Sequence, residues 1–296
     1  MKENILTIGI STRALFDLEF ENEIFCNGGA RDYVKYQVEH ESEVLKKGPA
    51  FSLIEAFLNL NKLQDEPVCQ VIIMSQNSAD SSLRIFNSIE YYGLDITRAA
   101  LTTGGSIIPY LGAYGVDLYL SVNERDVRKA IEAGVAAALI PTRYEGRDER
   151  ISQIRIAFDG DCVLFDSESE CIFQKEGLEA FGEHEKVRAF EPLKRGPFAN
   201  LLSLISKIQS LYDIEDSPIR TALVTARSAP AHERVIRTFR YWGVRIDEAH
   251  FLGGMEKTEV LRAFDADIFF DDNEDNIKAA SNIVLAAKVP NFLQVI

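Results

Sequence analysis

The sequence predicts an α/β fold in which parallel sheets are covered by helices on both faces. Two observations indicate it. Strand patterns alternate with helical patterns along the whole chain, and several strands, such as 71–75 and 222–225, are apolar on both faces. A third observation, an internal repeat, predicts that the fold occurs twice in the chain.

The repeat relates two segments 150 positions apart. RIFNSIEYYGLDITRA at 84–99 matches RVIRTFRYWGVRIDEA at 234–249, and the register continues from 110–130 to 260–280. GPAFSLIEAFL from Gly48 resembles GPFANLLSLI from Gly196 at an offset of 148. Chance similarity between amphipathic helices would not keep register through a glycine turn and the next strand. We therefore expect an N-terminal copy over 1–146 and a C-terminal copy over 147–296.

The sequence pattern predicts the same order of elements in each copy. A first strand leads into a polar helical region and a helix that begins near Gly-Pro, followed by a buried strand and a helix that ends at Gly93 or Gly243. A short strand, a helix, a strand and a last helix complete the copy. Pro141 and the charged stretch 143–150 are typical of a linker between the copies.

Composition restricts the partners. The chain has 296 residues, 46% hydrophobic and 26% charged, with a formal net charge of -14 and a pI near 4.9. This acidity argues against a nucleic-acid polymer or an anionic membrane surface as a partner, since both require clustered Lys and Arg. The sequence also lacks a signal-peptide pattern and an apolar run of about 18 residues that would span a membrane. We expect a cytoplasmic protein with four free cysteines.

Two carboxylates follow the first strand of the C-terminal copy. The run 154–158 reads as a buried strand, and Asp159 and Asp161 stand directly after it. In open α/β sheets, ligands bind beyond the carboxyl ends of the strands, which places both acids at the expected site. The alternative is a β-hairpin, for which Asp159-Gly160 between hydrophobic residues is a common turn.

The two copies differ where chemistry is expected. Ser11 and Arg13 occupy the positions of Asp159 and Asp161, and Ser121 and Val122 occupy those of Asp271 and Asp272, so the acids gather in the C-terminal copy. Several carboxylates in one crevice need a cation, and Mg²⁺ with oxygen ligands suits such a site. For Asp271 and Asp272 alone, helix capping is an equally good interpretation.

Four further positions predict phosphate binding. Thr225 ends a buried strand, and its hydroxyl together with the backbone N–H groups of Ala226 and Arg227 is suited to phosphoryl oxygens. Arg227 can add a bidentate contact, and Lys257, which replaces Ile107 of the other copy, a point charge. The structural alternatives are a helix cap, a solvated loop charge and a surface lysine.

These residues carry a resemblance to a known family. An Asp-x-Asp, a Thr, a Lys and an Asp-Asp in this order resemble the haloacid dehalogenase (HAD)-like phosphatases. STRALFDLE, RIFNSIEYYGLDITRA, RIAFDGDCVLFDSESE, KRGPF and DIFFDDNEDN together resemble the bacterial relatives of the cytosolic type I 5'-nucleotidases over nearly the whole chain.

The resemblance implies a role for each residue. Asp159 would be the nucleophile and Asp161 the general acid and base, while Thr225 and Lys257 would bind phosphate. Mg²⁺ would be held by Asp159, the Asp161 carbonyl, Asp271 and Asp272. The family often has another acid about four residues after the metal-binding Asp, which is Asp275 counted from Asp271 but Asn276 counted from Asp272, so the resemblance leaves open which of the pair binds metal.

The expected function is a Mg²⁺-dependent 5'-nucleotidase, built as two tandem HAD-like units of which only the C-terminal one is catalytic. Its partner would be a small-molecule nucleotide, with a helical cap at about 167–220 covering the site. Two alternatives are a HAD-type phosphatase for sugar phosphates or other small phosphomonoesters, and a non-catalytic nucleotide-binding protein. The sequence leaves a homo-oligomer open.

Overall fold

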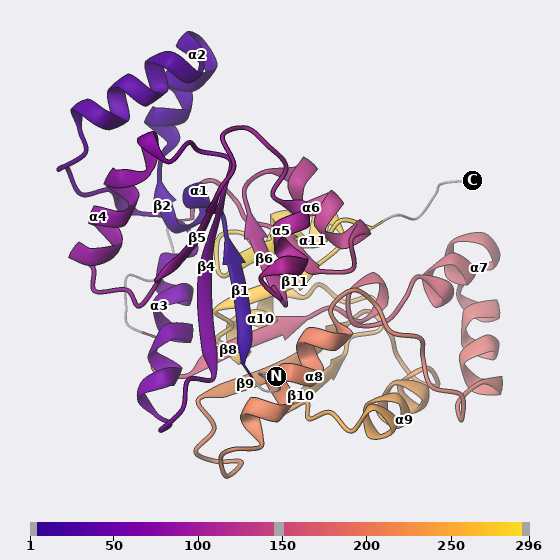
Figure 1. Cartoon of the computed structure of the whole chain (residues 1–296). Helices are drawn as coiled ribbons and strands as arrows, with labels where there is room; N and C mark the ends of the chain where they lie inside the picture. The colour runs from indigo at the N-terminus through magenta and orange to yellow at the C-terminus, as the bar shows by residue number, and fades with distance from the viewer. Residues whose placement is uncertain (1–4, 145–150, 292–296) are drawn as a thin grey trace. The chain divides into compact units, whose positions relative to one another are not determined.

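The computed structural model describes residues 5–144 and 151–291, and the chain divides into two compact units, Met1–Arg150 and Ile151–Ile296 (Figure 1). Residues 145–150, which make up most of the predicted linker, lie outside the described residues. No helix in the described ranges is both long enough and apolar enough to cross a membrane.

The first unit is built on five parallel strands in the order β5-β4-β1-β6-β7. A short antiparallel pair, β2 with β3, lies outside this order. The strands are β1 (Leu6–Ile10), β2 (Phe16–Asp17), β3 (Lys46–Lys47), β4 (Cys69–Ser75), β5 (Arg98–Leu101), β6 (Leu118–Ser121) and β7 (Ala136–Leu139). The helices are α1 (Thr12–Leu15), α2 (Glu19–Glu39), α3 (Phe51–Asn59), η1 (Leu60–Lys62), η2 (Asp80–Ser82), α4 (Leu83–Tyr91), α5 (Ile108–Ala113) and α6 (Glu124–Glu132).

The second unit repeats this topology, with five parallel strands in the order β10-β9-β8-β11-β12. The first strand of each five-stranded set is central. β4 and β6 flank β1 in the first unit, and β9 and β11 flank β8 in the second. The strands are β8 (Ile154–Phe158), β9 (Ile219–Thr225), β10 (Glu248–Phe251), β11 (Ile268–Asp271) and β12 (Leu285–Lys288). The helices are η3 (Gly160–Leu164), α7 (Glu168–Val187), α8 (Ala199–Gln209), α9 (His232–Trp242), α10 (Thr258–Phe264) and α11 (Glu274–Ala280).

Both faces of the second unit's central strands, β8, β9 and β11, are buried. Ala157 and Phe269 pack on one face in a cluster with residues of α10 and α11. The neighbouring residues Phe158 and Phe270 point to the opposite face, where their rings contact Phe198 just before α8. Because successive strand residues alternate between faces, a fully apolar strand is what two helical layers require.

The structure departs from the sequence-based expectations at two points, the number of strands and the extent of the cap, and it excludes one alternative, the hairpin. Each unit has a fifth strand, β7 or β12, that was not predicted. The turn after β8 is not a hairpin, since β8 is followed by the short helical turn η3 and pairs in parallel with β9 and β11. The predicted cap segment 167–220 holds α7 and α8 and ends inside β9, and the first unit has α2 and α3 in the corresponding place.

Candidate active site

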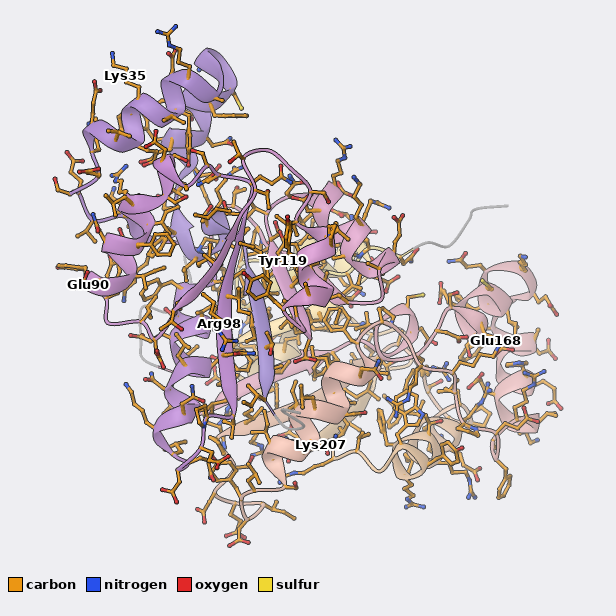
Figure 2. The ribbon with its side chains drawn as sticks, in the orientation of Figure 1. Lys35, Glu90, Arg98, Tyr119, Glu168 and Lys207 are labelled. Atoms are coloured by element: carbon orange, nitrogen blue, oxygen red, sulfur yellow. The ribbon has the colours of Figure 1, made fainter. Side chains whose placement is uncertain are left out.

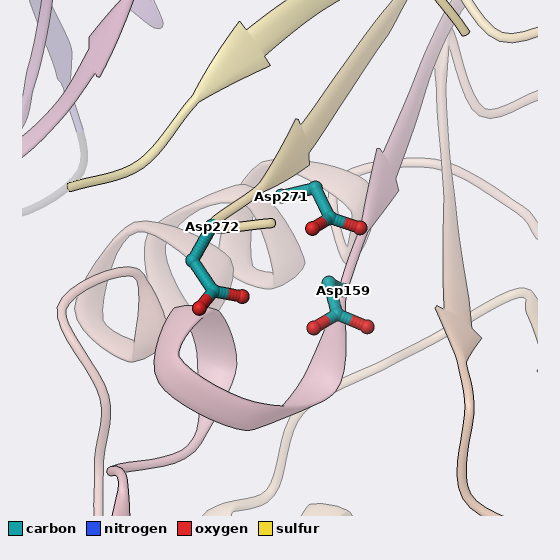
Figure 3. A group of neighbouring side chains, drawn as sticks. All are labelled: Asp159, Asp271 and Asp272. Atoms are coloured by element: carbon teal, nitrogen blue, oxygen red, sulfur yellow. The ribbon is translucent and has the colours of Figure 1, made fainter. Parts of the chain in front are cut away.

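Three carboxylates meet where β8 and β11 end. Asp159 is the residue after β8, Asp271 is the last residue of β11, and Asp272 follows it. Each offers a ligand oxygen, and these oxygens all lie within 4.8 Å of one another. Figure 3 shows the three side chains converging beyond the tips of the two strands. The topology explains the meeting, because β8 and β11 are parallel neighbours whose carboxyl ends share one edge.

Lys257 lies between two of these acids. Its Nζ donates to Asp159 Oδ1 at 2.5 Å and to Asp271 Oδ2 at 2.7 Å, and the lysine is 5% exposed. Burial acts to lower the pKa of Lys257, but the two carboxylates outweigh it and raise the pKa to about 12. The lysine is therefore a fixed positive charge inside the cluster.

One lysine does not neutralise three acids. Burial raises the pKa of Asp159 to about 8, against the opposing effect of Lys257, and the nearby Asp271 adds to the rise. Burial likewise raises the pKa of Asp272 to about 6. The positive charge of Lys257 therefore does not offset the burial of these carboxylates and their mutual repulsion. The oxygen donors and the charge deficit both fit a hard divalent cation such as Mg²⁺.

Asp271 is the most enclosed member of the cluster. It is fully buried, its Oδ1 accepts the Asn273 N–H at 2.7 Å, and its Oδ2 accepts from Asn276 Nδ2 at 3.0 Å as well as from Lys257. Asp272 is partly exposed and accepts from Asn291 Nδ2 at 2.5 Å. Both acids reach the cluster, whereas Asp275, four residues after Asp271, is exposed on α11.

The side chain of Asp161 is not part of the carboxylate cluster. Arg227 binds it in a bidentate pair, with Nε 2.8 Å from Oδ2 and Nη2 2.6 Å from Oδ1. Arg227 is itself buried after β9, and its pKa is raised because Asp161 and Glu185 outweigh the effect of burial. The predicted Asp-x-Asp therefore divides, one acid facing the lysine and the other facing the arginine.

Thr225 occupies the end of β9 next to the Asp159 turn. Its side chain is buried, and its Oγ1 accepts the Arg227 N–H at 3.3 Å. A methyl group added to Gly160 would lie 3.1 Å from Thr225 Oγ1, so the turn after Asp159 packs directly on this hydroxyl. Ala226 is exposed beside it.

Sequence reasoning missed a buried acid that supports Arg227. Glu185 of α7 is completely buried and accepts from Arg227 Nη1 at 2.5 Å, from Arg234 Nη1 at 2.8 Å and from Ser169 Oγ at 2.8 Å. Burial raises the pKa of Glu185, but the two arginines outweigh it and the net shift is downward. In the sequence, the repeat shows only that Arg234, one partner of Glu185, aligns with Arg84; the structure alone shows that both arginines are buried.

Four phenylalanines within or beside the predicted cap differ in exposure. Phe165 and Phe198 are fully buried in the core, and Phe181 is also buried, with the Arg227 guanidinium 5.3 Å from its ring centre. Phe173 is 44% exposed, which leaves its ring accessible to a ligand.

The fold and the site define an α/β protein with a buried acidic centre at the carboxyl edge of a parallel sheet. The chain matches the protein-family model described as 5'-nucleotidase over residues 1–294. It therefore belongs to the 5'-nucleotidase family, whose members are phosphoric monoester hydrolases. The expected family is confirmed.

Two individual proteins are similar to the chain. Human cytosolic 5'-nucleotidase 1B is 36% identical over 295 residues, which cover 95% of this chain and 48% of that protein, so the chain spans about half the length of this curated relative. Among solved structures, histidinol dehydrogenase from Elizabethkingia anophelis matches with a TM-score of 0.26 and 11% identity, over 96% of this chain and 52% of that one. A likeness this weak carries no argument.

Proposed function

We propose that the chain is a Mg²⁺-dependent 5'-nucleotidase that hydrolyses nucleoside 5'-monophosphates to nucleoside and phosphate. The observation that carries the proposal is the cluster of Asp159, Asp271 and Asp272 around Lys257, in a chain of the 5'-nucleotidase family. The second unit would be the catalytic HAD-like domain, and the first a copy without the catalytic acids.

Asp159 is the proposed nucleophile. Its carboxylate attacks phosphorus in line with the bond to the 5' oxygen, so that an O–P bond forms to Asp159 as the P–O5' bond breaks. Lys257 opposes the effect of burial and so favours the ionised carboxylate, and its ammonium group is placed to interact with the phosphoryl oxygens. Mg²⁺, held by Asp159, Asp271, Asp272 and the Asp161 carbonyl, would supply further positive charge at these oxygens.

Asp161 is the proposed general acid and base. It donates a proton to the leaving 5' oxygen, and it then takes a proton from the water that hydrolyses the aspartyl-phosphate. A carboxylate with both oxygens bound to Arg227 has no proton to give, so this pair must open first. A phosphoryl group that accepts from the Thr225 hydroxyl and the Ala226 N–H also offers the guanidinium alternative acceptors, and so releases Asp161 for the reaction.

We propose α7 as the part of the cap that acts on the site. Through Glu185 it binds Arg227, whereas α8 packs against β9 as a layer of the fold. Any ligand that moves Arg227 is thus coupled to α7, and the exposed ring of Phe173 on this helix is available to a nucleoside.

The test measures inorganic phosphate released from nucleoside 5'-monophosphates, deoxynucleotides, ribose 5-phosphate and glucose 6-phosphate, with Mg²⁺ or with EDTA. We expect nucleotides to be the best substrates, EDTA to abolish release, and Asp159→Asn to lower kcat by at least about a thousandfold. Asp275→Asn, at the exposed acid of α11, is the matched control and keeps its activity. Preference for sugar phosphates, or an Asp159→Asn variant with normal turnover, would contradict the proposal.

A further inference from the structure

The first unit contains a cavity where the second unit has its candidate active site. The cavity has a volume of about 360 Å³, which lies in the usual range for small-molecule sites of about 300–1,000 Å³. One wall comes from the ends of β1 and β4, through Thr12 and Asn77. In the second unit the corresponding strands are β8, which Asp159 follows, and β9, which ends at Thr225. The opposite wall comes from α2.

The helical wall is built alike in both units. α2 is interrupted at Gly29 (φ 76°, ψ -173°) and α7 at Gly177 (φ 84°, ψ -176°), so each helix folds back on itself at the same point. A buried arginine then fastens each one, Arg84 to Glu21 of α2 and Arg234 to Glu185 of α7. The framework around the cavity is therefore retained in the first unit, although its chemistry has changed.

The change in chemistry removes the charges. Ser11 stands at the position of Asp159, Ser121 at that of Asp271, Ile107 at that of Lys257 and Asn77 at that of Arg227. Within the described residues, the three acids of the second unit form the one group that could hold a metal ion. At these four positions the first unit therefore keeps none of the side chains that would bind a cation or a phosphoryl group in the second unit.

What remains suits an uncharged, planar, heteroaromatic ligand. Phe25 and Tyr33 line the cavity with their rings edge to face, 6.1 Å apart at 90°. Asn77 Nδ2 and Gln37 Nε2 each donate to the Tyr33 hydroxyl at 3.0 Å, which leaves the phenol hydrogen for an acceptor on a ligand. Aromatic faces beside amide and hydroxyl groups are the features that hold a nucleobase.

We propose that this cavity binds a nucleoside through its base and does not turn it over. The choice of a nucleoside rests on the proposed function, since it assumes that both copies of the repeat accommodate the same kind of ligand. A phosphate would add little to binding. The cationic side chain in the lining is that of Arg13, and its guanidinium is already paired with Glu19 at 2.6 Å. Adenosine and AMP should therefore bind with affinities within about threefold of each other.

The experiment uses the full chain with Phe25→Trp, a substitution at a ring that is 49% exposed and so has room for the larger side chain. The natural sequence has one tryptophan, Trp242 of the second unit, so the wild type reports any signal from there. Adenosine and AMP are titrated separately in EDTA, which prevents hydrolysis. We expect a saturable change in tryptophan fluorescence in the variant that is absent from the wild type.

Two further variants locate the ligand. Adding Asn77→Ala should weaken binding about tenfold, because it removes the amide group beside Tyr33. Adding Lys35→Ala should leave binding unchanged. Lys35 lies on α2, the helix that carries Tyr33, but its side chain projects outward and is 72% exposed (Figure 2). Hydrogen exchange in the wild type gives a second measurement that needs no variant, and adenosine should protect peptides within 18–34 and 76–81.

A chain that shows neither the fluorescence change nor the protection refutes the inference, as does binding that Asn77→Ala leaves intact. Because phosphate release is assayed separately, these results leave the proposed function standing. Conversely, a chain that releases no phosphate from any nucleotide but gives the Phe25→Trp signal overturns the proposed function alone.

Discussion

Replacing Glu185 with Gln tests the buried charge network that connects α7 to Arg227. The carboxylate is fully buried between Arg227 and Arg234, and neutralising it leaves both guanidinium groups short of a counter-charge. Removing one partner of a buried ion pair costs about 3–5 kcal/mol. Arg227 keeps Asp161, and the amide oxygen of Gln still accepts one bond, so we expect the lower end, about 3 kcal/mol.

Urea unfolding measures this loss as a lower midpoint at an unchanged m value. The melting temperature should fall by about 6–12 °C, at about 2–4 °C per kcal/mol for a chain of this size. Glu233→Gln is the matched control, because its pair with Arg237 is exposed, with side chains 48% and 39% accessible. It should cost less than about 0.5 kcal/mol. A Glu185→Gln variant as stable as this control would refute the reasoning.

The first unit suggests a second substitution that should restore part of the stability lost in Glu185→Gln. There Gln37 stands at the position of Glu185, and Glu21, at the position of Ser169, supplies the charge to Arg84 at 2.7 Å. Combining Ser169→Glu with Glu185→Gln should therefore recover about half of the lost stability, since the new carboxylate can pair with Arg234 but is not placed for Arg227. A double variant no more stable than Glu185→Gln would show that the position of the acid matters as much as its charge.

Three further outcomes are expected. Mg²⁺ at a hundred times its Kd should stabilise the wild type by about 2.7 kcal/mol in thermal unfolding. Asp271→Asn should lose this effect and the exposed Asp275→Asn should keep it; equal responses would contradict the metal site. Gly196→Ala should cost at least about 2 kcal/mol in urea unfolding, because the added methyl would lie 2.3 Å from the Phe165 carbonyl oxygen. Gly182→Ala, on an open face of α7, should cost nothing, and equal effects would refute the steric argument. Since the pKa of Glu185 is lowered in the folded state, its contribution is present above the ordinary value of 4.5 and lost as the pH falls through the folded value. The stability difference between wild type and Glu185→Gln should therefore be constant from pH 7 to about 5 and shrink below about 4.5; a constant difference at pH 3 would contradict it.

The alternation of strands and helices could be read from the sequence because the strands that form the centre of each unit are long and rich in β-branched residues. β7 and β12 escaped prediction for the opposite reason. Their sequences, AAAL and LAAK, are short and consist mainly of alanine, which has no preference for strands. Such a segment becomes a strand only because a neighbouring strand offers it a paired edge, a tertiary effect that a local pattern does not contain.

The candidate site divides in the same way. Asp159, Asp271 and Asp272 could be located because each follows an apolar strand, and parallel strands bring their carboxyl ends to one edge. Glu185 could not, because it lies in a helix rich in exposed acids, and nothing in the local sequence distinguishes the one acid that is buried. The pairing of Asp161 with Arg227 joins loops after different strands and likewise requires the three-dimensional structure.

The first unit shows that the acidic centre is not needed for folding. It has the same strand order as the second unit, with Ser11, Ile107 and Ser121 where the second has Asp159, Lys257 and Asp271. Burying carboxylates in the second unit is unfavourable, as the pKa of about 8 for Asp159 indicates, and a buried ion pair is weak evidence for stability. An unfavourable arrangement that the same fold can do without is best explained by a chemical task. The contrast between the two copies therefore argues for catalysis more strongly than the acids of the second unit would alone.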